Sequence, residues 1–556
     1  MELSDGSPPT LEEVAIAIAQ LNNTTPGNCR ISAPLLRYGG TAAAEWIHRV
    51  ILAAWATGKA PQDWKWVMLT YLYKGKGPRL LCDSHRGISL LSVCGKVYTN
   101  ILIRRLRRTI DPTLHEAQCG FRPGRGCPDH LFTLRRVCEL AHAHRTPLFA
   151  AFVDYKKAFD CLDREALWQL LAARGVHTHL IALIRDLYAG CEGEVHIQGA
   201  RSRRVRMRTG VRQGCALSPM LFNVYIDHIL RTALSTPDMQ AHGYPIASDA
   251  NGILSPPTPP RARPNATPHR ICFLLYADDL VLLSPTREGL TALLRRLEEV
   301  SSAWAMTINY SKTEAIHFHP SSTHRPPPGP TPTPPSPPPQ PTLPPPIRLR
   351  LGTVKFVHQF VYLGSTFTAD GALHTELRRR IGLARRTFTQ LGKLWKQHRL
   401  GVGVKMLVFK AIVPPTLLYG CETWALTAQQ TQQLDVFLHE CLRTVLGIRR
   451  GLHVANRELR LRCRQLDFST LVRKHRLRFL GHIARRPAER LTKVALFASH
   501  IPGVNARMRQ GGRYLTELFR EDLLAVGAFR DWYHSAQNRV AWRAMLEDKL
   551  SLNSVS

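Results

Sequence analysis

Two adjacent carboxylates, Asp278 and Asp279, stand between two apolar runs in ICFLLYADDLVLLS, residues 271–284. Burying like charges side by side costs free energy unless a partner compensates them. The runs CFLL and LVLLS predict two strands, and the short YADD segment between them predicts a hairpin turn. The turn is either a solvated tip or a rigid site at which a divalent cation supplies the missing positive charge.

A third carboxylate, Asp154, ends the apolar run LFAAFV. It is either a helix N-cap, a role that also suits Asp160 and Asp163, or a ligand at the end of a buried strand. If this strand lies beside the hairpin, three carboxylates converge on a site suited to two Mg²⁺ ions, with Mn²⁺ as a substitute, because both ions prefer oxygen ligands. Two such ions can activate a 3′-hydroxyl and stabilise a leaving pyrophosphate, so the cluster predicts nucleotidyl transfer.

The composition indicates the partner and the compartment. Among 556 residues, Lys and Arg number 75 against 41 Asp and Glu, a net charge of +34. Such an excess favours nucleic acid over a general solubility role. The 13 cysteines form no C-x-x-C pair, which indicates a reducing compartment. The polar start MELSDGSPP is no signal peptide, and no apolar run reaches membrane-spanning length, so we expect a soluble, intracellular protein without a membrane partner.

The elements that must position the carboxylates follow from hydrophobic periodicity. The first half mixes strands and helices, whereas the part after the proline-rich segment 325–346 is mostly helical, which predicts an α+β fold with helical appendages. The proline-rich segment predicts an extended, exposed spacer. Helices are expected over 11–21, 43–55, 95–110, 164–175, 376–397, 432–447 and 470–486, and strands over 67–77, 148–153, 272–275 and 280–284.

These motifs, in this order, resemble those of the reverse transcriptases of non-LTR (LINE-type) retrotransposons. FVDYKKAFD (152–160), GVRQGCALSPMLFN (210–223) and FLLYADD (273–279) resemble polymerase motifs A, B and C. The segments at 73–106 and 118–137 resemble the two fingers motifs, and WAMTINYSKTEAIHF (304–318) and FVYLGS (360–365) resemble motifs D and E. YGCETWAL (419–426) and RFLGHIARRP (478–487) are similar to the thumb and the region beyond it.

The resemblance implies roles for individual residues. Asp154, Asp278 and Asp279 would hold the metal ions, with the Tyr155 carbonyl as a further ligand. Phe159 would be a steric gate against a ribose 2′-hydroxyl, unless it is an ordinary core residue. The other residues expected to contact nucleotide, template or primer are Gln213, Gly214, Lys74, Arg86, Tyr276 and Lys312, of which Lys312 would protonate the leaving pyrophosphate.

The basic C-terminal residues predict a second nucleic-acid contact, although a charge run is commonly a solvated face. They are Arg473, Lys474, Arg476, Arg478, Arg485 and Arg486. We expect Trp532 and Trp542 in the core rather than as platforms for base stacking. The long spacings between Cys441, His453, Cys463 and His475 argue against a zinc site made by these four.

The resemblance implies a right-hand polymerase with fingers, an antiparallel palm sheet, a helical thumb and a basic helical C-terminal extension. The expected divisions are an N-terminal helical extension (1–64), fingers and palm (65–320, with a loop insertion at about 235–268), a proline-rich insertion (321–349), the motif E region (350–375), the thumb (376–450) and the C-terminal region (451–556).

The expected activity is RNA-directed DNA polymerisation with an RNA template, a DNA primer or target and dNTPs, in the nucleus of a eukaryote. No nuclease constellation is visible in the sequence. Two alternatives remain: an RNA-dependent RNA polymerase, which Phe159 opposes, and a catalytically inactive remnant that still binds nucleic acid.

Overall fold

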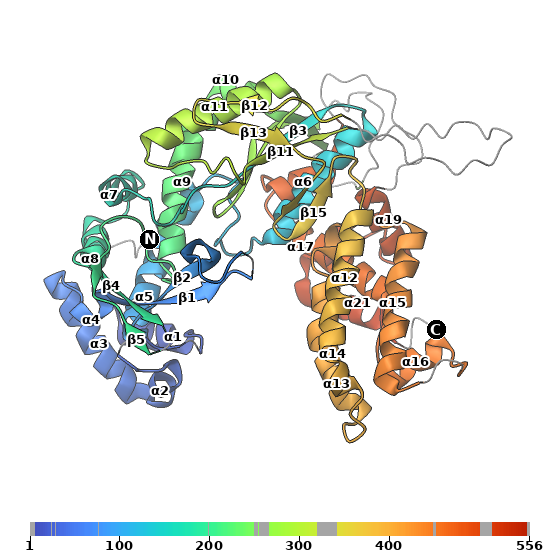
Figure 1. Ribbon diagram of the computed structural model, residues 1–556, viewed down its shortest axis with the longest axis horizontal. Helices are drawn as coiled ribbons and strands as arrows, with labels where there is room; N and C mark the ends of the chain where they lie inside the picture. Colours follow the sequence, from blue (N-terminus) through green and yellow to red (C-terminus); the bar gives the residue numbers. More distant parts are fainter. Residues whose placement is uncertain are drawn as a thin grey trace.

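The computed structural model describes residues 6–552 except 24, 28, 76, 198, 250–253, 255–265, 320–341, 449–451 and 501–513. Most of the predicted proline-rich insertion and part of the predicted loop at 235–268 therefore lie outside the described residues. Figure 1 shows two groups of elements, the N-terminal helices and strands on one side and helices α12–α16 on the other, joined through a central sheet.

The central sheet has six strands in the order β12-β13-β11-β3-β10-β9. Its middle strand, β3, is the LFAAFV run, in which every residue is buried because helices cover both faces of the sheet. The pairs β10–β3, β10–β9 and β11–β3 are antiparallel, as expected for the palm, whereas β11–β13 is parallel. The strands are β3 (Leu148–Val153), β9 (Phe273–Tyr276), β10 (Asp279–Ser284), β11 (Glu314–Phe318), β12 (Ile347–Arg348) and β13 (Thr353–Phe356).

Alternate residues of β3 point into two different cores. Ala151 and Val153 join the core that includes α9 (Ser218–Leu234) and α11 (Arg287–Ala303). Ala150 and Phe152 join the core that includes α6 (Cys127–Ala143). The second core also takes residues of β14 (Gln359–Tyr362) and β15 (Ser365–Thr368), the antiparallel pair that corresponds to the expected motif E. The end of β3, where Asp154 follows, is thereby held from both sides.

The fingers contain a second sheet in the order β2-β1-β4-β5, with β6 also on β4. Its strands are β1 (Trp66–Tyr73), β2 (His85–Leu90), β4 (Glu192–Ile197), β5 (Ala200–Arg201) and β6 (Val205–Arg206). The helices of this part, together with two 3₁₀ turns, are α1 (Leu11–Ala19), α2 (Ala33–Tyr38), α3 (Gly40–Thr57), α4 (Gln62–Lys65), α5 (Val93–Ile110), α7 (Arg164–Ala173), α8 (Thr178–Tyr188), η1 (Cys82–Ser84) and η2 (Asp111–Thr113).

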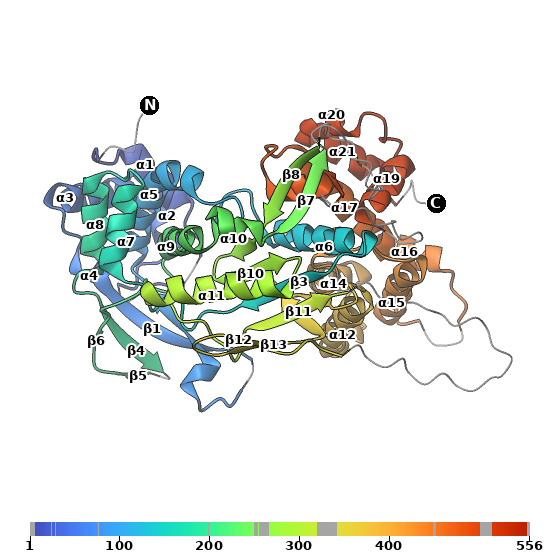
Figure 2. The ribbon, with the colours of Figure 1, turned by 90° about the horizontal axis from the view of Figure 1, so that it is seen from above.

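The segment expected as a loop at about 235–268 begins with structure. It contains α10 (Pro237–Ala241) and β7 (Tyr244–Asp249), which pairs with β8 (Ala266–Ile271) on one side and with β16 (Ala498–His500) on the other. Figure 2 shows β7 and β8 beside the C-terminal helices. The sequence pattern predicted a loop because turn-forming residues dominate the segment, and one of the two strand partners of β7, β16, lies far away in the chain.

The thumb helices share one core, and that core continues past the predicted boundary at 450. It joins α12 (His374–Gln390), α14 (Val402–Leu417) and α15 (Ala428–Leu446) to Leu459, Cys463, Phe468 and Val472. The helix expected over 376–397 is broken after α12, and the chain resumes as the short α13 (Gly392–Trp395). The remaining elements are η3 (Cys421–Thr423), α16 (Asn456–Cys463), α17 (Phe468–Ala484), α18 (Leu491–Phe497), α19 (Leu515–Ala525), α20 (Trp532–Gln537) and α21 (Arg539–Lys549).

The C-terminal helices pack around a further core of their own. It contains Trp532 and Trp542, so the expectation that both tryptophans are core residues is confirmed. None of the helices in the described part of the chain has the length and apolarity needed to cross a membrane.

Candidate active site

The three carboxylates that the sequence singled out lie at the ends of neighbouring strands. Residues 273–276 and 279–284 form the predicted hairpin, with Asp279 paired to Tyr276. Leu280 pairs with Val153 in the antiparallel β10–β3 ladder, so the register places Asp279 opposite Asp154. Two strands that are more than 100 residues apart in the chain thus bring the predicted acids to one edge of the palm.

Asp154 is held by residues of the predicted motif D. Its backbone carbonyl accepts a hydrogen bond from the Asn309 backbone N–H at 2.7 Å, and its Oδ2 accepts one from Asn309 Nδ2 at 2.9 Å. The Lys312 ammonium lies 3.4 Å from the same oxygen. Thr313 Oγ1 accepts from the Asp154 backbone N–H at 3.2 Å. The Asp154 side chain is therefore oriented toward the site while its second oxygen has no hydrogen-bond partner among the described residues.

The electrostatics of the turn are those of a site that lacks positive charge. Burial, then the charges of Asp278 and Asp154, raise the pKa of Asp279 to about 6, although this side chain reaches solvent. Burial and the Asp154 charge also raise the pKa of Asp278, while Arg86 and Lys312 oppose the rise. Two nearby basic residues do not offset the repulsion, so a divalent cation would stabilise the ionised cluster.

A strap at residues 117–120, whose role the sequence did not reveal, fixes the turn. Ala277 has φ +59°, a left-handed conformation that costs free energy for a residue with a Cβ atom. The Gln118 Oε1 accepts hydrogen bonds from the backbone N–H groups of Ala277 at 3.3 Å and Gly120 at 2.8 Å. The strap passes so close that a Cβ on Gly120 would lie 2.2 Å from the Ala277 nitrogen. Glycine is required at position 120 for this approach.

Gln118 is itself fixed by the motif B helix. Its Nε2 donates to Asn223 Oδ1 at 3.0 Å, and Asn223 Nδ2 donates to the Gly120 carbonyl at 2.8 Å. Gln118 is fully buried and Asn223 nearly so. In the sequence, the only sign that these two residues matter is that they lie within the motif-like segments 118–137 and 210–223. A glutamine or an asparagine does not by itself show which residue it will bond.

The motif B loop lies against the fingers sheet. The Gln213 carbonyl accepts from the Ser89 N–H at 2.8 Å, and Gly214 has φ +105° with Ser89 so near that a Cβ would meet its carbonyl oxygen at 2.8 Å. Phe159 is half-buried and its ring stacks on Phe222 at 4.5 Å between centroids. These contacts show how the three residues pack within the protein, but they do not test contact with a nucleotide. The expected roles of Gln213, Gly214 and Phe159 therefore stay predictions.

The other expected nucleotide contacts are spread more widely. Arg86, on β2, is close enough to lower the pKa of both turn aspartates, but the Lys74 ammonium donates to the Asp83 carbonyl at 2.6 Å and contacts no site residue among those described. Tyr276 is half-buried, with its ring edge-on to His130 at 6.0 Å. The Tyr155 hydroxyl is bonded to Ser301 at 2.9 Å and its ring is buried, so only its backbone is available to an ion.

The basic residues of α17 do not form the open surface that the sequence predicted. Arg473 and Arg476 are paired with Asp522, at 3.0 Å and 2.7 Å, and Lys474 and Arg478 are paired with Glu547. Lys474 and Arg476 are buried. Arg473 and Arg478 keep 41% and 39% of their side-chain surface exposed. The partner acids lie on α19 and α21, which pack against α17.

Arg485 and Arg486 are also engaged within the protein. Arg485 donates to the Ala536 carbonyl at 2.5 Å, and Arg486 donates to the Gly124 carbonyl. All six basic residues of this region thus have internal partners. Their contribution to nucleic-acid binding remains a prediction without structural support.

The remaining sequence hypotheses are also placed by the structure. Asp163, not Asp160, is the N-cap of α7 and accepts from Ala166 N–H at 2.9 Å. Cys441 and Cys463 are buried within the thumb core, whereas His475 lies near a different pair, Cys421 and Glu422.

An antiparallel sheet that gathers three carboxylates at one edge, beside a hairpin turn and basic residues of the fingers, defines a right-hand templated polymerase. A match to the family described as reverse transcriptase (RNA-dependent DNA polymerase) covers residues 73–367, more than half of the chain. The chain belongs to this family.

The chain is also similar to proteins of mobile elements. It is 23% identical over 453 residues to the RNA-directed DNA polymerase from mobile element jockey of Drosophila melanogaster, covering 79% of this chain and 44% of that protein. It is 30% identical over 229 residues to the Pol polyprotein from the type-2 retrotransposable element R2DM of the same organism, covering 41% of this chain and 19% of that protein. The chain spans less than half the length of these relatives.

A solved structure of telomerase from Candida tropicalis, in complex with a TWJ fragment of telomeric RNA, aligns with a TM-score of 0.37 and 10% identity. The alignment covers 93% of this chain and 68% of that one. This likeness is too distant to carry an argument about the present chain.

Proposed function

We propose that the chain is the RNA-directed DNA polymerase of a non-LTR retrotransposon, extending a DNA primer on an RNA template with dNTPs. The observation that carries the proposal is the convergence of Asp154 with the Asp278–Asp279 turn through the β3–β10 register. Family membership supports the choice of reverse transcription over other templated polymerisation. A chromosomal target would place the reaction in the nucleus.

The donor set fits two Mg²⁺ ions. The three side chains offer carboxylate oxygens. The raised pKa of Asp278 and of Asp279 reflects burial first and then repulsion from neighbouring acids, and a cation would relieve both. When bound there, the ions would lower the pKa of the primer 3′-hydroxyl and neutralise charge on the pyrophosphate.

The remaining roles fall to the chain's own residues. Asn309 and Thr313 keep Asp154 turned toward the site. Lys312, 62% exposed and beside Asp154, can reach a leaving pyrophosphate and donate a proton to it. Arg86 supplies positive charge on the fingers side, where phosphate oxygens of the nucleotide would lie. Phe159 would exclude a ribose 2′-hydroxyl.

Primer extension on poly(rA)/oligo(dT) tests the proposal, with the wild-type chain compared with Asp154→Ala in Mg²⁺. We expect incorporation of dTTP by the wild type and none by the variant. Equal incorporation by both proteins would remove the metal-site assignment. Extension with rNTPs in preference to dNTPs would identify an RNA polymerase instead. RNA binding that persists in Asp278→Asn, with no extension in Mg²⁺ or Mn²⁺, would identify an inactive remnant.

A further inference from the structure

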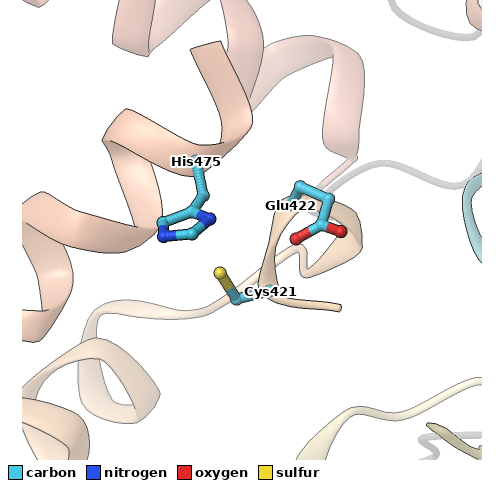
Figure 3. Close-up of side chains that lie close together, drawn as sticks. All are labelled: Cys421, Glu422 and His475. Carbon is cyan, nitrogen blue, oxygen red and sulfur yellow. The ribbon is translucent and has the colours of Figure 1, made fainter. Parts of the chain in front are cut away.

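A second cluster of metal-ligating side chains, made of other residues than the palm acids, lies between the η3 turn of the thumb and α17. Cys421 and Glu422 are neighbours in the η3 turn, and His475 projects from α17 (Figure 3). One ligand atom of each residue lies within 4.8 Å of those of the other two. A thiolate, a carboxylate and an imidazole at this separation need only small side-chain adjustments to share one ion.

The cluster adjoins a cavity of about 570 Å³ that both Glu422 and His475 line. The other lining residues include Pro128, Leu131, Pro414, Pro415 and Leu418, so most of the wall is apolar. Cys421 is fully buried behind the cavity wall, whereas His475 is exposed. An ion held by the three side chains would therefore have one coordination position facing the cavity, where a water molecule could bind.

Glu422 has no compensating cation in the metal-free protein. Its side chain is 9% exposed, and it forms no ion pair with the residues that the structure describes. The Arg476 guanidinium in α17 is already bonded twice to Asp522, at 2.7 Å and 3.0 Å. Burying a carboxylate without a cationic partner is costly, so an ion that binds beside Glu422 would stabilise it.

The charges of the cluster match those of a divalent cation. With one thiolate and one carboxylate as ligands, the bound cluster would be electrically neutral, and the protons of the thiol and the carboxyl would leave to solvent.

We propose that Cys421, Glu422 and His475 bind one Zn²⁺ ion, with water at a fourth, cavity-facing position. The mixed sulfur, nitrogen and oxygen ligand set suits Zn²⁺, whereas Mg²⁺ prefers oxygen ligands alone. The site joins the η3 turn, between α14 and α15, to α17, so it fixes the thumb against the C-terminal region. It is independent of the polymerase acids and of their metal.

Zinc content and cobalt substitution test the proposal on the full chain, purified with a phosphine reductant and without Mg²⁺ or dNTPs. Zinc release is measured with a chromogenic chelator, and Co²⁺ reports thiolate ligation through its sulfur charge-transfer band. We expect one Zn²⁺ per chain and a cobalt–thiolate band in the wild type. Cys421→Ala should abolish the band, and the matched variant Cys441→Ala, which removes a buried thumb cysteine outside the cluster, should keep it.

His475→Gln provides a second variant whose folding is not in question, because His475 is exposed. Its affinity for Zn²⁺ should fall by more than about tenfold, the loss that even an outer partner of a metal ligand causes. The proposal is overturned if the wild type binds no Zn²⁺, or if Cys421→Ala and Cys441→Ala give the same cobalt spectrum. Primer extension is not a readout here, so the outcome is separate from that of the polymerase test.

Discussion

Replacing Asp279 with asparagine should stabilise the metal-free protein while it abolishes polymerase activity. Asparagine keeps the shape of the side chain and removes one of the charges that repel each other in the turn. The pKa of Asp279 rises from 3.8 to about 6 in the folded chain, mainly through burial and then through Asp278 and Asp154. At about 1.36 kcal/mol per unit of pKa, this rise corresponds to a destabilisation of the ionised side chain by roughly 3 kcal/mol.

Solvent reduces that figure. Asp279 reaches the surface, and charges in contact with water interact far more weakly than buried ones, so we expect a gain of about 1 kcal/mol in the free energy of unfolding. For a chain of 556 residues this is a rise of roughly one degree in the thermal midpoint.

The pH dependence follows from the direction of the shift. Below about pH 4 the Asp279 carboxyl is protonated in both the folded and the unfolded chain, so it has no effect on the free energy of unfolding. Between about pH 4 and pH 6 the unfolded chain loses this proton more readily, and the penalty grows as the pH rises. Above about pH 6 the penalty in the free energy of unfolding is constant. The advantage of Asp279→Asn should therefore be present at about pH 7.5 and nearly gone at about pH 4.

Calorimetry in EDTA, followed by titration with Mg²⁺, measures these effects. The wild type should gain stability from Mg²⁺ above about pH 6, Asp279→Asn should gain much less, and its primer extension should fall by at least about 10²-fold. Asp163→Asn is the matched control, because asparagine caps a helix as well as aspartate does. The reasoning fails if Asp279→Asn is less stable than the wild type in EDTA at about pH 7.5, or if its advantage is the same at both pH values.

Three further substitutions test other parts of the site by steady-state primer extension. Gln118→Ala removes the acceptor of the Ala277 and Gly120 N–H groups, and we expect about a tenfold lower kcat and a stability loss of about 1–3 kcal/mol, with the dNTP KM nearly unchanged. Lys312→Met should lower kcat by roughly 10²-fold, with partial recovery in Lys312→Arg, and an unchanged rate would exclude proton donation. Phe159→Ala should raise rNTP use relative to dNTP use, and unaltered selectivity would assign Phe159 to the packing against Phe222 alone.

The palm and its acids were predictable because their sequence signals are local. LFAAFV is continuously apolar, as a strand covered on both faces must be, and YADD is short enough to force a hairpin. The ion pairs of α17 were not predictable, because their partners are distant in the sequence. Arg476 meets Asp522 across 46 residues of sequence, so the pattern displays the cations of α17 without the acids that neutralise them.

The placement of the Asp278–Asp279 turn depends on contacts that no motif displays. The strap at 117–120 contacts the hairpin through Gln118, which accepts from the Ala277 N–H, and through the Ala117 carbonyl, which accepts from the Leu275 N–H at 3.0 Å. His130 on α6 bonds the same Ala117 carbonyl at 3.0 Å. The other ring nitrogen of His130 lies 3.2 Å from the Tyr362 hydroxyl. The turn, the strap and the motif E strand are thus tied into one hydrogen-bonded unit.

This arrangement explains how a strained turn can hold two repelling acids at a fixed position. Neither the hairpin nor the acids favour the left-handed conformation of Ala277 by themselves, so the surrounding contacts must over-determine it. A substitution in the strap would therefore act on catalysis through geometry, although the strap supplies no ligand. The motifs indicate which groups we propose for the chemistry, and contacts between distant segments determine where those groups stand.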